Sequence, residues 1–117
     1  MRTLFVIIVF IGIIMFFGEK DETIEQSNER TCNDHLSALL ASQSIVKKNL
    51  KAPSTAQFPS SISKDTKIIF VSKCKHFVSS YVDAQNSFGA MLRSTYSMYI
   101  EYRPISKDWL GTEILIN

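Results

Sequence analysis

The feature that most restricts the fold is a two-residue alternation of apolar and polar side chains between residues 79 and 102, SSYVDAQNSFGAMLRSTYSMYIEY. One side of its second half carries the large apolar residues Leu92, Tyr96, Met98, Ile100 and Tyr102. Because only an extended chain places every second residue on one face, this pattern predicts half-buried strands. The polar centre, DAQNSFG, is rich in turn-forming residues, so the two halves are expected to form a hairpin.

Two further strands and one helix are predicted around this hairpin. The segment KIIFVSKC (67–74) precedes it, and DWLGTEILI (108–116) follows it after a turn. Apolar residues recur at helical spacing between Asn33 and Lys51, at positions Leu36, Leu39, Leu40, Val46 and Leu50. Asn33 or Asp34 is expected to cap this helix, and Pro53 is expected to end it. The predicted fold class is α+β, with one amphipathic helix packed on a four-stranded antiparallel β-meander in two layers.

The first 18 residues form an apolar run, MRTLFVIIVFIGIIMFFG, without charge after Arg2. A helix of about 20 apolar residues crosses a hydrocarbon core of roughly 30 Å, and a signal peptide has an apolar region of similar length. Neither a small-residue cleavage pattern nor a lipid-attachment cysteine follows the run. A retained transmembrane helix is therefore favoured, and a cleaved signal peptide and a buried core helix are the alternatives.

Charge predicts the orientation of this anchor. The amino side carries Arg2, whereas the acidic segment 19–31, EKDETIEQSNERT, follows on the carboxyl side. Because basic flanks stay in the cytoplasm, we expect a single-pass protein of the inner membrane with its N-terminus inside. Residues 19–31 would be a spacer, and residues 32–117 would form the extracytoplasmic domain, which would be secreted if the first segment were cleaved. The net charge of +2 gives no reason to expect a nucleic-acid partner.

The two cysteines, Cys32 and Cys74, are expected to form a disulfide, because cysteine pairs outside the cytoplasm usually do and a small domain gains stability from it. Unlinked thiols are one alternative. In another, the pairs Cys32-x-x-His35 and Cys74-x-His76 supply four ligands to a tetrahedral zinc ion. A nucleophilic pair of Cys74 and His76 would lack an orienting Asn or Asp and an oxyanion donor. The prediction is a disulfide without metal or cofactor.

Two motifs carry a resemblance to known proteins. The segments VKKNLKAPSTAQFPS (46–60) and SYVDAQNSFGAMLRSTYSMYIEY (80–102), with a late tryptophan at Trp109, resemble a family of small bacterial and phage-associated exported domains. These share LK.PSTA.FP and YVDAQNSFGA..R..Y patterns and typically follow an N-terminal membrane segment, a lipoprotein signal or a short zinc ribbon. The resemblance spans about 75 of the 117 residues. It implies the fold and export, and it implies no activity.

The residues of these motifs have two interpretations. In the structural one, Asp83 and Asn86 cap turn amides, Gly89 takes a positive φ, Arg93 pairs with Asp83, and Phe88 folds back onto the sheet. In the functional one, polar and aromatic side chains form an exposed recognition patch of Ser54, Thr55, Gln57, Asp83, Gln85, Asn86, Phe88 and Arg93. Catalysis by Asp83 is disfavoured, because no second carboxylate or histidine is placed to act as the other general acid or base. We therefore predict that the protein is not an enzyme.

The sequence thus predicts a membrane-anchored, extracytoplasmic binding module of the bacterial cell envelope. Its expected partner is an envelope protein, which it would serve as an inhibitor, an immunity or exclusion factor, or an assembly accessory. The alternative is a redox- or metal-responsive structural or sensor domain that uses Cys32, His35, Cys74 and His76.

Overall fold

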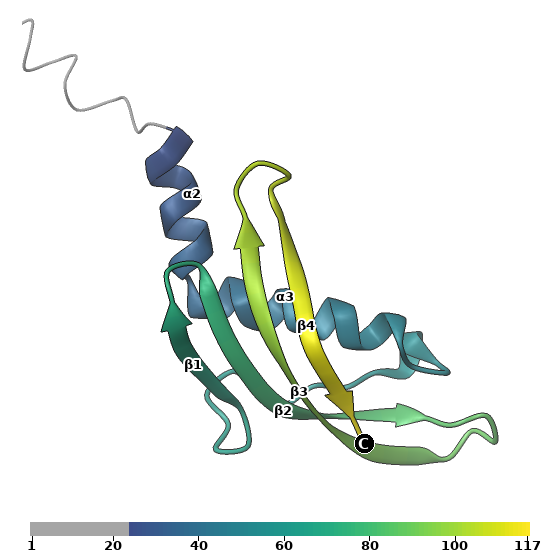
Figure 1. Ribbon diagram of the computed structural model, residues 1–117. Coiled ribbons are helices and arrows are strands. Elements are labelled where there is room, and N and C mark those ends of the chain that lie inside the picture. The colour runs from purple at the N-terminus through teal and green to yellow at the C-terminus, as the bar shows by residue number, and fades with distance from the viewer. Residues whose placement is uncertain (1–23) are drawn as a thin grey trace, which may run out of the picture.

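The computed structural model describes residues 24–117, in which two helices pack on one four-stranded antiparallel sheet (Figure 1). The helices are α2 (Ile24–Asn33) and α3 (His35–Lys48). The strands are β1 (Lys67–Ser72), β2 (Lys75–Gln85), β3 (Met91–Arg103) and β4 (Asp108–Ile116), and they lie in the order β1-β2-β3-β4. The predicted α+β meander is confirmed.

The expectation of a single helix is wrong, because α2 occupies most of the segment predicted to be a spacer. The predicted anchor at residues 1–18 lies outside the described residues. Within residues 24–117, no helix is both long and apolar enough to cross a membrane.

The chain turns between the two helices at Asp34. This residue has extended backbone angles, and its carboxylate accepts hydrogen bonds from the amides of Leu36 and Ser37, at 3.4 and 3.2 Å. Asp34 is therefore the N-cap of α3. It is one of the two residues, Asn33 and Asp34, that the sequence predicted for this role. At the other end, α3 stops at Lys48, earlier than the predicted Lys51. Asn49 is the C-cap, and Pro53 instead begins a short 3₁₀ turn over Pro53–Thr55.

The face of α3 that packs on the sheet differs from the predicted stripe. Its buried residues are Ala38, Leu39, Ser42 and Val46, whereas Leu36 and Leu40 are about half exposed. The small side chains of Ala38 and Ser42 let the helix approach the sheet closely, and this turns the bulkier Leu36 and Leu40 to the flanks. The predicted stripe is therefore confirmed at Leu39 and Val46 and wrong at Leu36 and Leu40.

The sheet has one face against α3 and one toward solvent. Along β2 and β3, buried residues alternate with half-buried or exposed ones, as the sequence predicted. The inner face carries His76, Val78, Ser80, Val82 and Ala84 from β2, and Tyr96, Met98, Ile100 and Tyr102 from β3. Phe58, from the loop after α3, packs edge-on against Tyr96 with ring centroids 6.2 Å apart. The core therefore lies between α3 and the two central strands.

The outermost strand β4 comes close to α3 through Gly111. A Cβ atom at this position would lie 2.9 Å from Cδ1 of Ile45 and 3.3 Å from Sδ of Met98. Gly111 thus lets β4 close one side of the core.

Candidate functional site

The turn that joins β2 to β3 is held by one asparagine side chain. The Oδ1 atom of Asn86 accepts hydrogen bonds from the amides of Phe88 and Ala90, at 2.9 and 3.0 Å. The backbone amide of Asn86 also donates to the carbonyl of Ala90 at 2.9 Å, and Gly89 has a φ of +81°. The predicted structural roles of Asn86 and Gly89 are both present, and they fix the shape of the turn.

Phe88 does not fold back onto the sheet as expected. Its side chain is 95% exposed, and the nearby Met91 and Leu92 are about half exposed. In Figure 1 this end of the β2–β3 hairpin extends beyond the part of the sheet that α3 covers, so the hairpin tip has no second layer to pack against. We call Phe88, Met91 and Leu92 the tip cluster. Met91 and Leu92 are neighbours in β3 and point to opposite faces of the sheet, so the three residues share the end of the hairpin rather than one face.

An ion pair clamps the two strands just behind this tip. The guanidinium of Arg93 donates two hydrogen bonds to the carboxylate of Asp83, Nε to Oδ1 at 2.8 Å and Nη2 to Oδ2 at 3.0 Å. These hydrogen bonds lower the pKa of Asp83, and the carboxylate raises the pKa of Arg93. Arg93 also lies over the ring of Tyr81, 3.8 Å from its centroid. The predicted pairing of Arg93 with Asp83 is confirmed.

The structure brings the two sequence motifs together at the end of β2. The backbone of Gln57 exchanges two hydrogen bonds with that of Asp83, at 2.8 and 2.9 Å. The hydroxyl of Thr55 accepts a hydrogen bond from the amide of Gln85 at 2.9 Å. Gln57 therefore forms an isolated bridge to β2, the 3₁₀ turn Pro53–Thr55 lies beside it, and Ser54 is exposed within this turn.

The eight residues of the predicted patch thus have different environments. Asp83, Gln85 and Arg93 lie on the solvent face of the sheet, because their neighbours in β2 alternate inward. The side-chain oxygen of Asn86 already accepts two hydrogen bonds from turn amides, whereas Phe88 projects into solvent. The most accessible members are Phe88, Ser54, Gln57 and Arg93.

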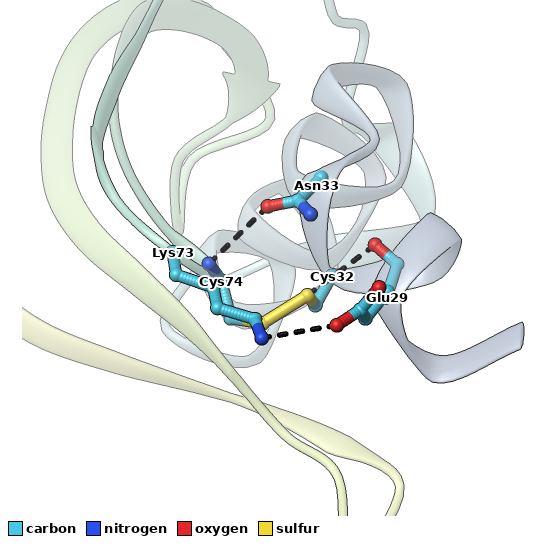
Figure 2. A network of polar contacts seen from close by, with 5 residues as sticks. All are labelled: Glu29, Cys32, Asn33, Lys73 and Cys74. Atoms are coloured by element: carbon cyan, nitrogen blue, oxygen red, sulfur yellow. Dashed lines mark hydrogen bonds and ion pairs between the residues drawn. A yellow bond between two sulfur atoms is a disulfide. The ribbon is translucent and has the colours of Figure 1, made fainter. Parts of the chain in front are cut away.

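The two cysteines form the predicted disulfide, Cys32–Cys74, with Cα atoms 4.4 Å apart (Figure 2). It joins the end of α2 to the turn between β1 and β2. Lys73 forms an ion pair with Glu29 at 3.0 Å across the same junction, and the side-chain oxygen of Asn33 accepts from the amide of Cys74 at 3.4 Å. The disulfide removes both thiols, so a Cys74 nucleophile does not exist in this state of the protein.

The two histidines of the zinc alternative meet beside the disulfide. The rings of His35 and His76 are in edge contact, with centroids 5.0 Å apart. His76 is fully buried, its burial lowers its pKa, and neither ring nitrogen has a hydrogen-bond partner among residues 24–117. With the disulfide formed, no group of three or more His, Cys, Asp or Glu side chains in this part of the chain is placed to hold a metal ion.

The turn between β3 and β4 was not singled out from the sequence as a candidate site. Arg103 and Asp108 form a bidentate ion pair at its base, at 2.9 and 2.6 Å, and the hydroxyl of Ser106 donates to Asp108 at 2.7 Å. Between them Ile105 is 99% exposed. The only available signal was an isolated isoleucine inside the polar stretch RPISKD.

The chain matches no protein-family model, no curated protein sequence and no solved structure. The resemblance to small bacterial and phage-associated domains therefore stays a prediction that rests on the two motifs.

Proposed function

We propose that this protein is a membrane-anchored binding module of the bacterial cell envelope, with its folded domain outside the cytoplasm and an envelope protein as its partner. The apolar run at residues 1–18 supplies the anchor. The Cys32–Cys74 disulfide supports the extracytoplasmic location, because disulfides persist in oxidising compartments. The proposal assigns no catalytic reaction to the domain.

One observation carries the binding role: the exposure of Phe88 at a braced turn. A solvent-exposed phenylalanine gains nothing for the stability of the domain, and most large aromatic side chains are buried. Its turn is already ordered by Asn86, so binding through Phe88 would cost little conformational entropy. Aromatic residues, phenylalanine among them, and arginine are enriched at the cores of protein interfaces.

The location of the tip cluster supports the same role. The β2–β3 turn and α2 lie at opposite ends of the sheet (Figure 1). If the chain is anchored through residues 1–18, which precede α2, the tip cluster faces away from the membrane. It would then be presented to proteins in the surrounding envelope.

Site-specific crosslinking tests this proposal. The full-length chain, with a photoreactive amino acid in place of Phe88, is expressed in its bacterial host and irradiated. A discrete crosslinked protein is expected at position 88 and not with the same group at Ile62, which is 92% exposed in the loop before β1. The absence of a specific product at position 88, in protein shown to be folded and exported, would refute the binding role of the tip cluster.

A second candidate is a redox- or metal-responsive domain. It is favoured by the gathering of Cys32, His35, Cys74 and His76 at one junction, as a disulfide and an adjacent ring contact. Reduction would free two thiols beside two imidazoles, which are ligand types that zinc prefers. The test is the metal content of protein purified under reducing conditions with zinc present, and a metal-free, folded protein would exclude this candidate.

A further inference from the structure

At each end of the sheet, one braced turn carries an almost fully exposed apolar side chain. At one end, Asn86 holds the turn that exposes Phe88. At the other end, the pair of Arg103 and Asp108 holds the turn that exposes Ile105. Consecutive turns of an antiparallel meander lie at opposite ends, and β3, whose 13 residues join these two turns, separates them by about 43 Å. The two exposed residues therefore face different surroundings.

The turn that carries Ile105 lies at the same end of the sheet as α2. In Figure 1 the β3–β4 turn and α2 both rise from that end. The contact between them is close, since α2 packs against β3, and Asn28 of α2 lines a shallow hollow together with Pro104. The disulfide ties α2 to the adjoining β1–β2 turn. Ile105 is therefore held in a fixed relation to the start of α2.

The start of α2 lies close to the segment that we propose as the anchor. Residues 19–23 separate the apolar run from Ile24, and this stretch of six Cα–Cα steps spans at most roughly 20 Å. The helix α2 itself, with 10 residues, is about 15 Å long. If residues 1–18 insert in a bilayer, the end of the domain that carries Ile105 is therefore the end next to that bilayer.

We infer that the β3–β4 turn docks on the lipid surface of the bilayer that holds residues 1–18, with Ile105 entering the interfacial region. This inference rests on the proposed function, because it requires the anchor. Lys107, exposed two residues after Ile105, has a long side chain that can reach lipid phosphates while Ile105 contacts acyl chains. The ion pair of Arg103 with Asp108 keeps the turn ordered before contact. The domain then stands on the membrane with the tip cluster directed away.

Fluorescence quenching by lipid tests this orientation. Single variants Ile105→Cys and Phe88→Cys of the full-length chain are labelled with the same fluorophore without reducing the disulfide. Each is reconstituted into vesicles of phosphatidylcholine and phosphatidylglycerol with brominated acyl chains, which quench only fluorophores that touch them. Both positions are almost fully exposed, so labelling should not disturb the fold, and unchanged thermal unfolding verifies this. The label at residue 105 is expected to be quenched and that at residue 88 is not.

A second pair of variants measures the contribution of the isoleucine. The label is placed at Ser106→Cys, with and without Ile105→Ser. Burial of one large aliphatic side chain changes a binding equilibrium by about tenfold or more. The ratio of quenched to unquenched label should therefore decrease by about that factor when Ile105 is replaced.

Each outcome decides one of the two proposals. If the protein does not float with the vesicles, the anchor is refuted and the docked turn is refuted with it. If the protein floats but residue 105 is quenched no more than residue 88, the anchor stands and the docked turn is refuted. Equal quenching with and without Ile105→Ser would also overturn the inference, because the contact would then not depend on the isoleucine.

Discussion

Removal of the Cys32–Cys74 disulfide provides a quantitative test of how the helices are held on the sheet. The bond joins residues 42 positions apart. In the chain-entropy model, a closed loop of this size lowers the entropy of the unfolded chain by about 13 cal/mol/K, or about 4 kcal/mol at 25 °C. Small domains have a free energy of unfolding of about 5–15 kcal/mol, so the variant Cys32→Ala/Cys74→Ala should lose a large part of this stability.

The assay is equilibrium unfolding in guanidinium of the full-length protein in a mild detergent, followed by the fluorescence of Trp109. The double variant should show a lower midpoint, and reduction of the wild-type protein with a dithiol should give a similar decrease. Lys73→Ala is the matched control, because it removes only the exposed ion pair with Glu29 across the same junction. This control should change the free energy of unfolding by less than about 1 kcal/mol. A double variant within about 1 kcal/mol of the wild type would refute the reasoning.

Four further predictions concern single residues. Gly111→Ala should change the free energy of unfolding by less than about 1 kcal/mol in the same assay, because the nearest atoms, Cδ1 of Ile45 and Sδ of Met98, belong to flexible side chains that can shift; a larger loss would show that these side chains cannot move. Burial lowers the pKa of His76 in the folded protein, so the neutral imidazole stabilises the fold fully at pH values above the unfolded-state pKa of about 6.5. This contribution to the free energy of unfolding is lost as the pH falls below that value. The melting temperature should thus decrease more steeply on acidification in the wild type than in His76→Phe, and parallel curves would argue against a buried neutral imidazole. Asn86→Ala should cost about 1–2 kcal/mol, since two turn amides lose their acceptor, and an unchanged denaturation midpoint would contradict this role. Phe88→Ser should alter the free energy of unfolding by less than about 0.5 kcal/mol, and a larger loss would show that Phe88 packs within the domain.

The candidate site was predictable where local chemistry decides the structure. Asn86 and Gly89 shape a turn through bonds and angles within five residues, and Arg93 faces Asp83 because the hairpin register follows from that turn. For Phe88 the sequence left two interpretations open, folded onto the sheet or exposed in a patch, because its exposure depends on where α3 stops covering the sheet. The contact of Gln57 with Asp83 was equally hidden, since it joins two segments through backbone atoms alone.

The sequence by itself predicted the four strands and the inward and outward faces of β2 and β3, and it favoured the disulfide over unlinked thiols and a metal site. Alternation has a period of two, so the buried face of β2 and β3 follows from residue order, and two cysteines allow a single pairing. The tertiary structure decided that residues 24–33 form a helix although they are mostly polar, and that Ala38 and Ser42 rather than Leu36 and Leu40 face the sheet. It also decided that the turn carrying Ile105 lies at the same end of the sheet as α2, while the turn carrying Phe88 lies at the far end. These features depend on contacts between segments distant in sequence, and local periodicity contains no information about which surface a segment will meet.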